Sequence, residues 1–248
     1  MNETNPSTDP TAGFSLESFD PDGIAVVFGS TGGIGSALLS ILTEVAYFKT
    51  VLGFSRQSSI PIDLTDELSL ERAAKVAAAA GEIRLVIDAT GFLNDTNQKP
   101  EKTWRELDAH KLANAFAINA IGPALLIKHV LPRMPRSGKS VLSTLSARVG
   151  SIGDNRLGGW YAYRASKAAL NQIVRTASIE LARRAPEAIC IALHPGTVDT
   201  ALSAPFAKSG LNLHTPASAA ANMLNVVDGL SKDNSGGFFD WRGAALPW

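Results

Sequence analysis

One stretch near the start of the chain restricts the possible folds more than any other. Residues 24–28 read Ile-Ala-Val-Val-Phe, residues 29–35 read Gly-Ser-Thr-Gly-Gly-Ile-Gly, and residues 33–46 have the apolar spacing of a helix. Glycines let the backbone turn tightly and approach a phosphate with no Cβ in the way, and the helix that follows offers free amide groups. A strand, a glycine-rich turn and a helix in this order predict a dinucleotide-binding fold.

The glycines are spaced Gly-x-x-x-Gly-x-Gly, because Leu38 stands where a Gly-x-Gly-x-x-Gly motif would have its last glycine. A glycine-rich turn can also be purely structural, so the interpretation rests on its place between strand and helix. The residues expected to contact the cofactor phosphates are Gly29, Ser30, Thr31, Gly33, Ile34 and Gly35.

Segments with strand character alternate with helical segments along the rest of the chain. Strands are predicted at residues 24–28, 50–54, 83–89, 139–145 and 188–193, with an abbreviated strand or edge at 60–64 and a last strand at 237–239. Helices are predicted at residues 33–46, 66–80, 106–133, 163–184 and 217–230, with Pro123 bending the third. This alternation predicts an α/β fold, a single doubly wound Rossmann domain with a mainly parallel seven-stranded sheet flanked by helices. The domain is expected at residues 21–248, after a flexible tail at residues 1–20.

Composition argues against several classes of function. The 248 residues carry 23 basic and 23 acidic side chains, so we expect no nucleic-acid partner and no attraction to anionic membranes. No stretch is predicted to be long and apolar enough to cross a bilayer, the N-terminus lacks the pattern of a signal peptide, and a soluble protein is expected. The single cysteine, Cys190, lies in an apolar run, which predicts a buried strand thiol, no metal site and a cytoplasmic location.

The end of the predicted second strand indicates which dinucleotide binds. NAD sites usually place a carboxylate there for the ribose 2′-hydroxyl, but residues 53–56 read Gly-Phe-Ser-Arg. A guanidinium and a hydroxyl suit a 2′-phosphate, so Arg56 favours NADP over NAD, with an ordinary surface charge as the alternative. Asp63 and Leu64 are expected beside the adenine, provided that the short strand at residues 60–64 forms.

Tyr163 and Lys167 are four residues apart at the start of a predicted helix, so their side chains share one face. A phenol titrates at about pH 10, and a neighbouring cation stabilises the phenolate and lowers its pKa. The pair is therefore a candidate general acid and base, although two such residues also meet at this spacing by chance.

Five motifs together resemble those of the short-chain dehydrogenase/reductase family in their order and spacing. They are the glycine-rich turn, Asp88-Ala-Thr-Gly91, Asn119, Tyr163-Arg-Ala-Ser-Lys167 and His194-Pro-Gly-Thr197. The resemblance extends from Asp22 to Trp248. Residues 150–167 and 243–248 are similar to the C-factor (C-signal) branch of the family, whose relatives include sniffer-type carbonyl reductases.

The resemblance implies hydride transfer between a nicotinamide cofactor and a small carbonyl or alcohol substrate. It implies that Tyr163 is the general acid and base, that Lys167 holds the nicotinamide ribose and lowers the tyrosine pKa, and that Asn119 bends the long helix and helps to hold a proton-relay water. Gly91 would line the adenine side, and His194 is expected to be a satisfied histidine at a strand end. The residues expected to cover the nicotinamide are Pro195, Gly196, Thr197 and Val198. Family members usually associate through the helices at residues 106–133 and 163–184, which implies a homodimer or homotetramer.

The chain departs from the family at the catalytic serine, which usually opens a Ser-x-x-Gly motif. With Gly150 as the anchor, that position holds Ala147, and Ser146 lies one residue earlier. A one-residue offset on a strand normally turns a side chain to the other face. Three alternatives remain open: a bulge brings Ser146 round as the fourth catalytic residue, Ser151 replaces it, or Tyr163 alone polarises the carbonyl.

Two hypotheses of function follow. The first is an NADP-dependent carbonyl reductase or alcohol dehydrogenase, which the joint presence of Tyr163, Lys167 and Asn119 favours. The second is a dinucleotide-binding signalling or interaction protein with weak or no catalysis, which Ala147 favours.

Overall fold

Six parallel strands form one sheet in the part of the chain that the structure, a computed structural model, describes: residues 15–96, 98–203 and 213–248. In chain order the strands are β1 (Ile24–Phe28), β2 (Thr50–Phe54), β3 (Ile83–Asp88), β4 (Ser140–Leu145), β5 (Ala188–His194) and β6 (Phe238–Asp240). Across the sheet they are ordered β2-β1-β3-β4-β5-β6, and each neighbouring pair is parallel. The predicted open parallel sheet is confirmed.

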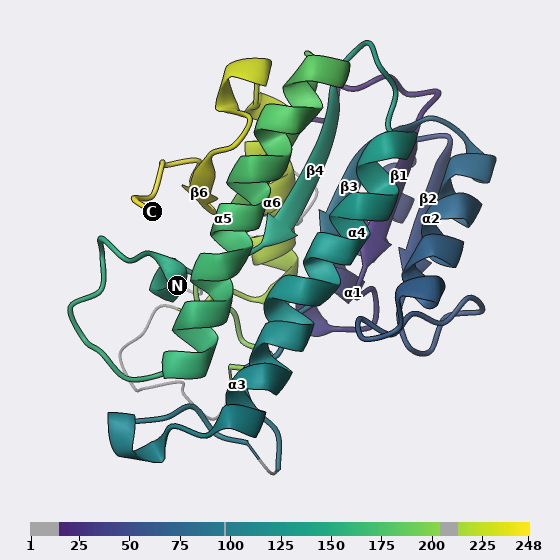
Figure 1. Ribbon diagram of the computed structural model, residues 1–248. Coiled ribbons are helices and arrows are strands. Elements are labelled where there is room, and N and C mark those ends of the chain that lie inside the picture. The colour runs from purple at the N-terminus through teal and green to yellow at the C-terminus, as the bar shows by residue number, and fades with distance from the viewer. Residues whose placement is uncertain (1–14, 97, 204–212) are drawn as a thin grey trace, which may run out of the picture.

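Helices cover both faces of the sheet (Figure 1). One face carries α2 (Glu67–Ala80), α4 (Gly122–Val130) and α5 (Tyr161–Arg184), and the other carries α1 (Gly33–Val45) and α6 (Pro216–Gly229). Along β1, Ile24, Val26 and Phe28 belong to the first core, whereas Ala25 and Val27 belong to the second. Because successive strand residues face opposite sides, a strand covered on both faces is apolar throughout.

The predicted seventh strand at residues 60–64 was wrong, because this segment is a loop in the structure. The Ile62 N–H donates to the Ser55 carbonyl at 3.0 Å, and the Asp63 N–H donates to the Ser69 hydroxyl at 2.9 Å. These local bonds satisfy backbone groups that a strand would pair with the sheet. Among the described residues, β2 is therefore left as an edge of the sheet.

The helix predicted at residues 106–133 is divided into several pieces. After the short 3₁₀ turn η1 (Trp104–Glu106), α3 (Ala109–Phe116) runs into a π-helical turn, η2 (Ala117–Ile121), and then into α4 and the 3₁₀ turn η3 (Leu131–Arg133). The Gly122 N–H bonds five residues back to the Ala117 carbonyl, and Pro123 has no N–H for the Asn119 carbonyl. The irregularity predicted at Pro123 is thus centred on the turn that contains Asn119.

The helical run Ala109–Arg133 has 25 residues, and its most apolar window of 18 residues has a mean hydropathy of 1.4. By length and composition alone, it is long and apolar enough to cross a membrane. The prediction that no segment reaches this level was wrong. In the structure, 44% of its most apolar window is buried, and α4 packs against α2 and α5. The core helix of a globular domain has these same properties.

The N-terminal part of the chain is packed from residue 16 onward. Leu16 and Phe19 are buried beside Phe48, and the Ser18 hydroxyl donates to the Asp228 carboxylate at 2.5 Å. Residues 15–20 therefore belong to the folded domain rather than to the predicted tail, because two of their side chains complete the core beneath α1 and α6. Residues 1–14 of the predicted tail lie outside the described residues.

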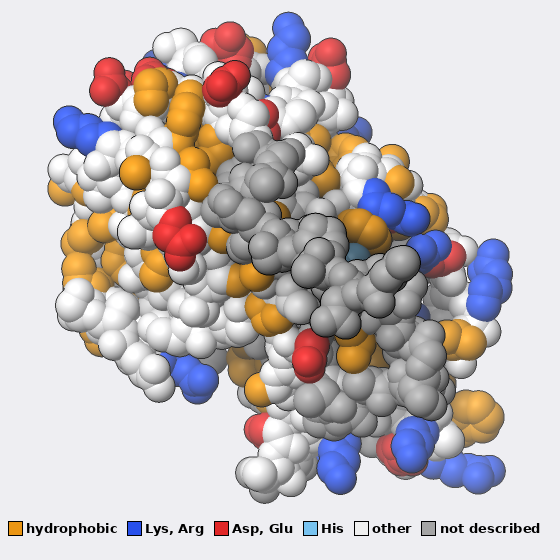
Figure 2. Space-filling view, turned by 180° about the vertical axis from the view of Figure 1, so that it is seen from behind, with side chains coloured by type: hydrophobic (Ala, Val, Ile, Leu, Met, Phe, Trp, Pro, Cys, Tyr) orange, Lys and Arg blue, Asp and Glu red, His pale blue; other side chains and the backbone are white. Residues whose placement is uncertain are grey.

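Charged side chains of both signs are spread over the surface. On the face shown in Figure 2, Lys and Arg are interspersed with Asp and Glu. Basic and acidic side chains are thus mixed on this face, and no large area of it carries charge of one sign only.

Candidate active site

Two of the sequence motifs lie together at the point in the sheet where successive strands are added on opposite sides of β1. From β1 the chain passes to β2 on one side, and it returns to β3 on the other. Open α/β sheets bind ligands in the crevice that this arrangement leaves at the carboxyl ends of the strands. Gly29 directly follows β1, and the Ala89 N–H after β3 donates to the Phe28 carbonyl at 2.9 Å. The glycine-rich turn and the Asp88-Ala-Thr-Gly91 motif are therefore adjacent.

Two pockets lie along this edge. The larger, about 580 Å³, is lined by Tyr163, by residues 195–198 and by the segment after β4. The smaller, about 460 Å³, is lined by the glycine-rich turn, by residues 55–57 and 62–65, and by residues 89–92. Ile34 in the first turn of α1 borders the larger pocket, and Gly32 borders the smaller. The start of α1 thus lies between them, and one elongated ligand can contact both.

Neighbouring atoms lie so close to three positions of the turn that only glycine fits there. Gly29 has a φ of +77°, and a Cβ there would lie 2.9 Å from the Ala89 backbone. A Cβ on Gly35 would lie 2.1 Å from the Gly29 carbonyl oxygen, and one on Gly33 would lie 2.7 Å from the Thr200 side chain. No side chain caps α1 and its first turn has no acidic residue, so its N–H groups are available to an anion.

The smaller pocket also contains the residues predicted to recognise the adenosine end of the cofactor. Arg56, Asp63 and Leu64 all line it, although residues 60–64 are not a strand. Asp63 accepts from the Thr65 N–H and hydroxyl at 2.8 and 2.7 Å, and these bonds, together with the weaker field of Arg56, lower its pKa. A guanidinium on the rim and free amides at the start of α1 fit a dinucleotide that carries a 2′-phosphate.

Helix α5 carries Tyr163 and Lys167 on the face toward the sheet. Its start is fixed by Glu101, whose carbonyl accepts from the Trp160 N–H at 2.5 Å and whose carboxylate accepts from the Ala162 N–H at 3.2 Å. Trp160 adopts a left-handed φ of +54°, and its ring meets the Tyr163 ring edge-on at 6.2 Å. These contacts position Tyr163 in the wall of the larger pocket.

Burial sets the protonation of both side chains. Burial raises the pKa of Tyr163 to about 12 and lowers the pKa of Lys167 to about 8, with the field of Asp88 opposing the latter change. The Lys167 ammonium donates to the Leu145 carbonyl at 2.7 Å and lies 6.0 Å from the centre of the Tyr163 ring. In the protein alone, Tyr163 is therefore a protonated phenol, and no lowering of its pKa by Lys167 is seen.

Asn119 connects the π-helical turn to the loop after β3. Its Oδ1 accepts from the Phe92 N–H at 2.8 Å, and its Nδ2 donates to the Phe92 carbonyl at 2.7 Å and to the Ser166 hydroxyl at 3.1 Å. A Cβ on Gly91 would lie 3.6 Å from both Asn119 Oδ1 and Lys167 Nζ. Asn119, Lys167 and Gly91 therefore converge on one point between the two pockets.

The three alternatives for the missing serine can be compared directly. The pairing of β4 with β5 shows no bulge, and the Ser146 N–H continues it to the Leu193 carbonyl at 2.9 Å. Ser146 is among the residues that line the larger pocket, but its hydroxyl donates its one proton to Asn171 Oδ1 at 2.6 Å. The buried Ser151 hydroxyl accepts from the Asp154 N–H at 3.1 Å. Ala147 itself lines the larger pocket.

The remaining predicted residues divide into pocket walls and supports. Pro195, Gly196, Thr197 and Val198 line the larger pocket, and Thr31 and Gly91 line the smaller. Ser30 is buried with its N–H bonded to the Phe54 carbonyl at 3.1 Å, so it supports the turn.

For two residues of β5, Cys190 and His194, the sequence predicted the surroundings of the side chain. Cys190 is fully buried, and burial raises the pKa of its thiol to about 12, which confirms the predicted strand thiol. His194 lies at the strand end as predicted and lines the larger pocket, but its buried Nδ1 has no hydrogen-bond partner among the described residues. The expectation of a satisfied histidine was therefore wrong.

Sequence reasoning did not identify three residues that position this site. Asn171 binds Ser146, Glu101 fixes the start of α5, and Asp88 lies buried with its carboxylate bonded to the Thr90 N–H and hydroxyl at 3.0 and 2.5 Å. Asn171 is four residues after Lys167, so the helical spacing that identified Lys167 also places Asn171 on the same face. No local pattern indicates Glu101, because its partners lie about sixty residues away.

Comparisons with known proteins agree with this geometry. A family model described as enoyl-(acyl carrier protein) reductase matches residues 42–227. The C-signal protein of Myxococcus xanthus is 39% identical over 143 residues, which make up 58% of this chain and 82% of that protein. A second relative, 1-hydroxy-2-glutathionyl-2-methyl-3-butene dehydrogenase of Rhodococcus sp. (strain AD45), is 30% identical over 192 residues, 75% of this chain and 78% of that protein.

Solved structures share the fold. The carbonyl reductase Sniffer of D. melanogaster has a TM-score of 0.79 at 21% identity, over 92% of this chain and all (100%) of that one. The NADPH-bound carbonyl reductase from chicken fatty liver has a TM-score of 0.78 at 24% identity, over 92% of this chain and 99% of that one. The resemblance seen in the sequence is thus confirmed, and the chain belongs to the short-chain dehydrogenase/reductase family of oxidoreductases.

Proposed function

We propose that this protein is an NADP-dependent carbonyl reductase or alcohol dehydrogenase that acts on small carbonyl or alcohol compounds. One observation carries the proposal: Tyr163 lines a pocket of about 580 Å³ that adjoins the phosphate-binding turn. Behind it, Lys167 and Asn119 meet beside Gly91. A binding-only protein has no evident need for a buried tyrosine and lysine at this place.

In the proposed reduction, a bound NADPH would supply the hydride that the carbonyl carbon takes up, and NADP⁺ would remain. The Tyr163 hydroxyl donates its proton to the carbonyl oxygen, so that the C=O bond becomes an alcohol. Burial favours this direction, because a phenol with a pKa of about 12 carries its proton at neutral pH. Lys167 keeps a positive charge below about pH 8, and it would stabilise the phenolate that forms as the proton leaves.

The preference for NADP rests on Arg56. It lies on the rim of the smaller pocket, and the described pocket-lining residues 55–57 include no carboxylate for a ribose 2′-hydroxyl. The chicken carbonyl reductase, whose solved structure contains NADPH, has the same fold. We therefore propose NADP as the cofactor, held by Gly29, Thr31 and Arg56 at its phosphates.

The direct test is cofactor oxidation with a panel of small aldehydes and ketones. We expect turnover with NADPH for at least one compound, and a higher kcat/KM with NADPH than with NADH. Absence of turnover across the panel, with NADPH binding intact by fluorescence, would contradict the proposal.

The contacts of Ser146 support a second candidate function, a dinucleotide-binding protein with weak catalysis. Because its proton is bonded to Asn171 and Ala147 offers no hydroxyl, Tyr163 is proposed as the single donor to the carbonyl oxygen. Loss of one such donor typically costs a hundred- to a thousandfold in rate, so a dinucleotide-binding protein with weak catalysis is the alternative.

The substitution Ala147→Ser separates these possibilities. In a working reductase it adds a hydroxyl at the pocket wall and should raise kcat by about tenfold or more. If activity stays absent although NADPH still binds, the binding-only function is favoured. Ser146→Ala serves as the matched change on the neighbouring residue and should lower kcat only slightly.

The cytoplasmic location and a homodimer or homotetramer remain predictions from the single cysteine and from the family resemblance. Size-exclusion chromatography with light scattering measures the oligomeric state.

A further inference from the structure

The part of the larger pocket that is formed by the segment after β4 and the start of α5 carries an excess of positive charge. Its charged lining residues among those described are Arg148, Asp154, Arg156 and Arg164. All four lie in the segment after β4 or in the first turns of α5. The lining therefore has three cationic side chains and one anionic side chain, whereas the whole chain has equal numbers of basic and acidic residues.

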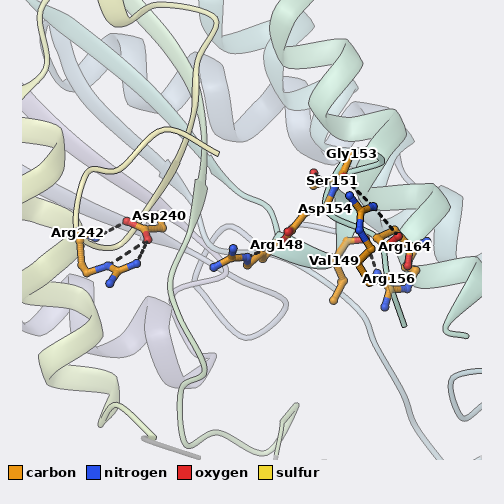
Figure 3. A network of polar contacts seen from close by, with 10 residues as sticks. Arg148, Val149, Ser151, Gly153, Asp154, Arg156, Arg164, Asp240 and Arg242 are labelled. Carbon is orange, nitrogen blue, oxygen red and sulfur yellow. Dashed lines mark hydrogen bonds and ion pairs between the residues drawn. The ribbon is translucent and has the colours of Figure 1, made fainter. Parts of the chain in front are cut away.

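Among the described residues, one of these three arginines is paired with a carboxylate. Arg148 Nε donates to Asp154 Oδ2 at 2.6 Å, and this bond lowers the pKa of Asp154 (Figure 3). Arg164 instead donates from Nε to the Gly159 carbonyl at 3.0 Å and from Nη1 to the Val149 carbonyl at 3.2 Å. Backbone carbonyls hold the Arg164 guanidinium in place without neutralising its charge.

Arg156 is held in the same way. Its Nη1 donates to the Gly153 carbonyl at 3.0 Å and to the Asn155 carbonyl at 3.3 Å (Figure 3). Among the described residues, neither Arg156 nor Arg164 has a carboxylate within ion-pair distance. Each guanidinium also has an Nη2 group that donates no hydrogen bond to the described residues.

The rest of this wall is apolar, with Leu93, Leu157 and Trp160 among its members. A guanidinium oriented by the backbone and bordered by apolar side chains binds carboxylate or phosphate oxygens more strongly than a freely hydrated one. If these arginines only held the loop at residues 148–159 in place, the bonds to backbone carbonyls would be enough, and two uncompensated charges in the same pocket as Tyr163 would not be needed.

We infer that the larger pocket selects carbonyl substrates that carry an anionic group, a carboxylate or a phosphate, and that Arg156 and Arg164 bind that group while Tyr163 faces the carbonyl. This inference rests on the proposed function and specifies its substrate class. The anion and the carbonyl belong to one molecule, so the arginines contribute to orientation as well as to affinity.

Matched pairs of substrates test the inference. Succinic semialdehyde is compared with its methyl ester, and glyceraldehyde 3-phosphate with glyceraldehyde, each with NADPH. The wild-type protein should show at least a tenfold higher kcat/KM for the anionic member of one pair, and added salt should reduce that ratio. The pair with the larger ratio identifies the anion as carboxylate or phosphate. Equal kcat/KM values within both pairs would overturn the inference and leave the proposed function standing.

Two substitutions connect the ratio to the arginines. Arg156→Gln and the double change Arg156→Gln with Arg164→Gln should lower the anionic-to-neutral ratio by about tenfold or more. Arg156 is exposed and bonds only within its own loop, so its single variant keeps α5 intact even if the double variant is less stable. Arg72→Gln, at an exposed position on α2, is the matched control and should leave the ratio unchanged.

The NADPH dissociation constant is measured for each variant by fluorescence. An unchanged constant together with a lower ratio supports substrate binding by these arginines. A weakened NADPH affinity with an unchanged ratio would assign them to the cofactor and overturn the inference. Absence of turnover for every compound would overturn the proposed function, and this inference with it.

Discussion

Burial, more than any single ion pair, determines the chemistry of the two helical residues at the pocket. It raises the pKa of Tyr163 to about 12 and lowers that of Lys167 to about 8. The Lys167 ammonium donates to the Leu145 carbonyl and makes no hydrogen bond with the Tyr163 hydroxyl among the described residues, so Tyr163 keeps its proton in the protein alone. Under the proposed function, this proton is the one that reduction would use, and oxidation would require Tyr163 to lose it first.

At the same scale, Arg56 tests the choice of cofactor. The substitution Arg56→Glu should raise the KM for NADPH roughly ten- to a hundredfold, because a charge-assisted bond to the 2′-phosphate is replaced by repulsion. The KM for NADH, which lacks that phosphate, serves as the internal control and should change little. Equal changes for both cofactors would show that Arg56 does not recognise the 2′-phosphate.

Spacing along the helix was enough to predict that Tyr163 and Lys167 share one face of α5, because they lie one turn apart. The fate of Ser146 was not predictable in this way. Its hydroxyl is bonded to Asn171, twenty-five residues away in the chain, and only the packing of α5 on β4 brings them together. The charge excess around Arg156 was missed for the same reason, because the sequence alone does not show which wall a loop residue lines.

At the level of secondary structure elements, the π-helical turn η2 couples the helices to the site. It turns Asn119 inward, where one side chain bonds both backbone groups of Phe92 as well as Ser166. The turn thus links the loop after β3 to α5. The family resemblance implied a bend at Asn119 and the sequence predicted one at Pro123, and the structure shows a π-helical turn that contains Asn119 and ends just before Pro123.

Asn119→Ala should lower the free energy of unfolding by about 2–4 kcal/mol, because it leaves the Phe92 N–H and carbonyl without partners. Urea denaturation measures this change. Asn114→Ala on the preceding helix is the matched control, since Asn114 is exposed and its side chain makes a single hydrogen bond, to Gln98. Its cost should stay below about 1 kcal/mol. Equal costs for the two variants would argue against Asn119 as the structural link.

The alternation of apolar runs and helical segments predicted the order of elements because every strand except the half-buried edge strand β2 is buried along nearly its whole length. The error at residues 60–64 has a local cause. The hydroxyls of Ser58 and Ser69 supply hydrogen bonds to this segment, with Ser58 donating to the Ile60 carbonyl at 2.7 Å. An apolar run of this length is compatible with either a strand or a loop, and side-chain bonds from the neighbouring elements decided between them.

At the scale of the whole molecule, a buried neutral histidine makes stability depend on pH. Burial lowers the pKa of His194 to about 4, with the field of Asp240 acting in the opposite direction. An unfolded chain binds a proton at this residue below about pH 6.5, whereas the folded chain does not do so until about pH 4. Stability should therefore be intact above pH 6.5 and fall as the pH decreases between these values.

The substitution His194→Gln should remove much of this dependence. In the wild-type protein, His194 should account for a loss of as much as about 3 kcal/mol between pH 6.5 and 4, which urea denaturation across that range measures. His110→Gln, at an exposed position on α3, is the control and should retain the wild-type slope. A His194→Gln variant with the same slope would assign the acid sensitivity to other groups.

The central claim is that Tyr163 protonates the carbonyl oxygen, and Tyr163→Phe tests it most directly because phenylalanine keeps the ring and removes only the hydroxyl. Tyr161→Phe, at the first residue of α5 and outside the described lining of the larger pocket, is the matched control. Single-turnover reduction with NADPH should slow by about a hundred- to ten-thousandfold in Tyr163→Phe, with NADPH affinity and the Tyr161→Phe rate unchanged. A Tyr163→Phe rate within a few-fold of wild type would contradict the account.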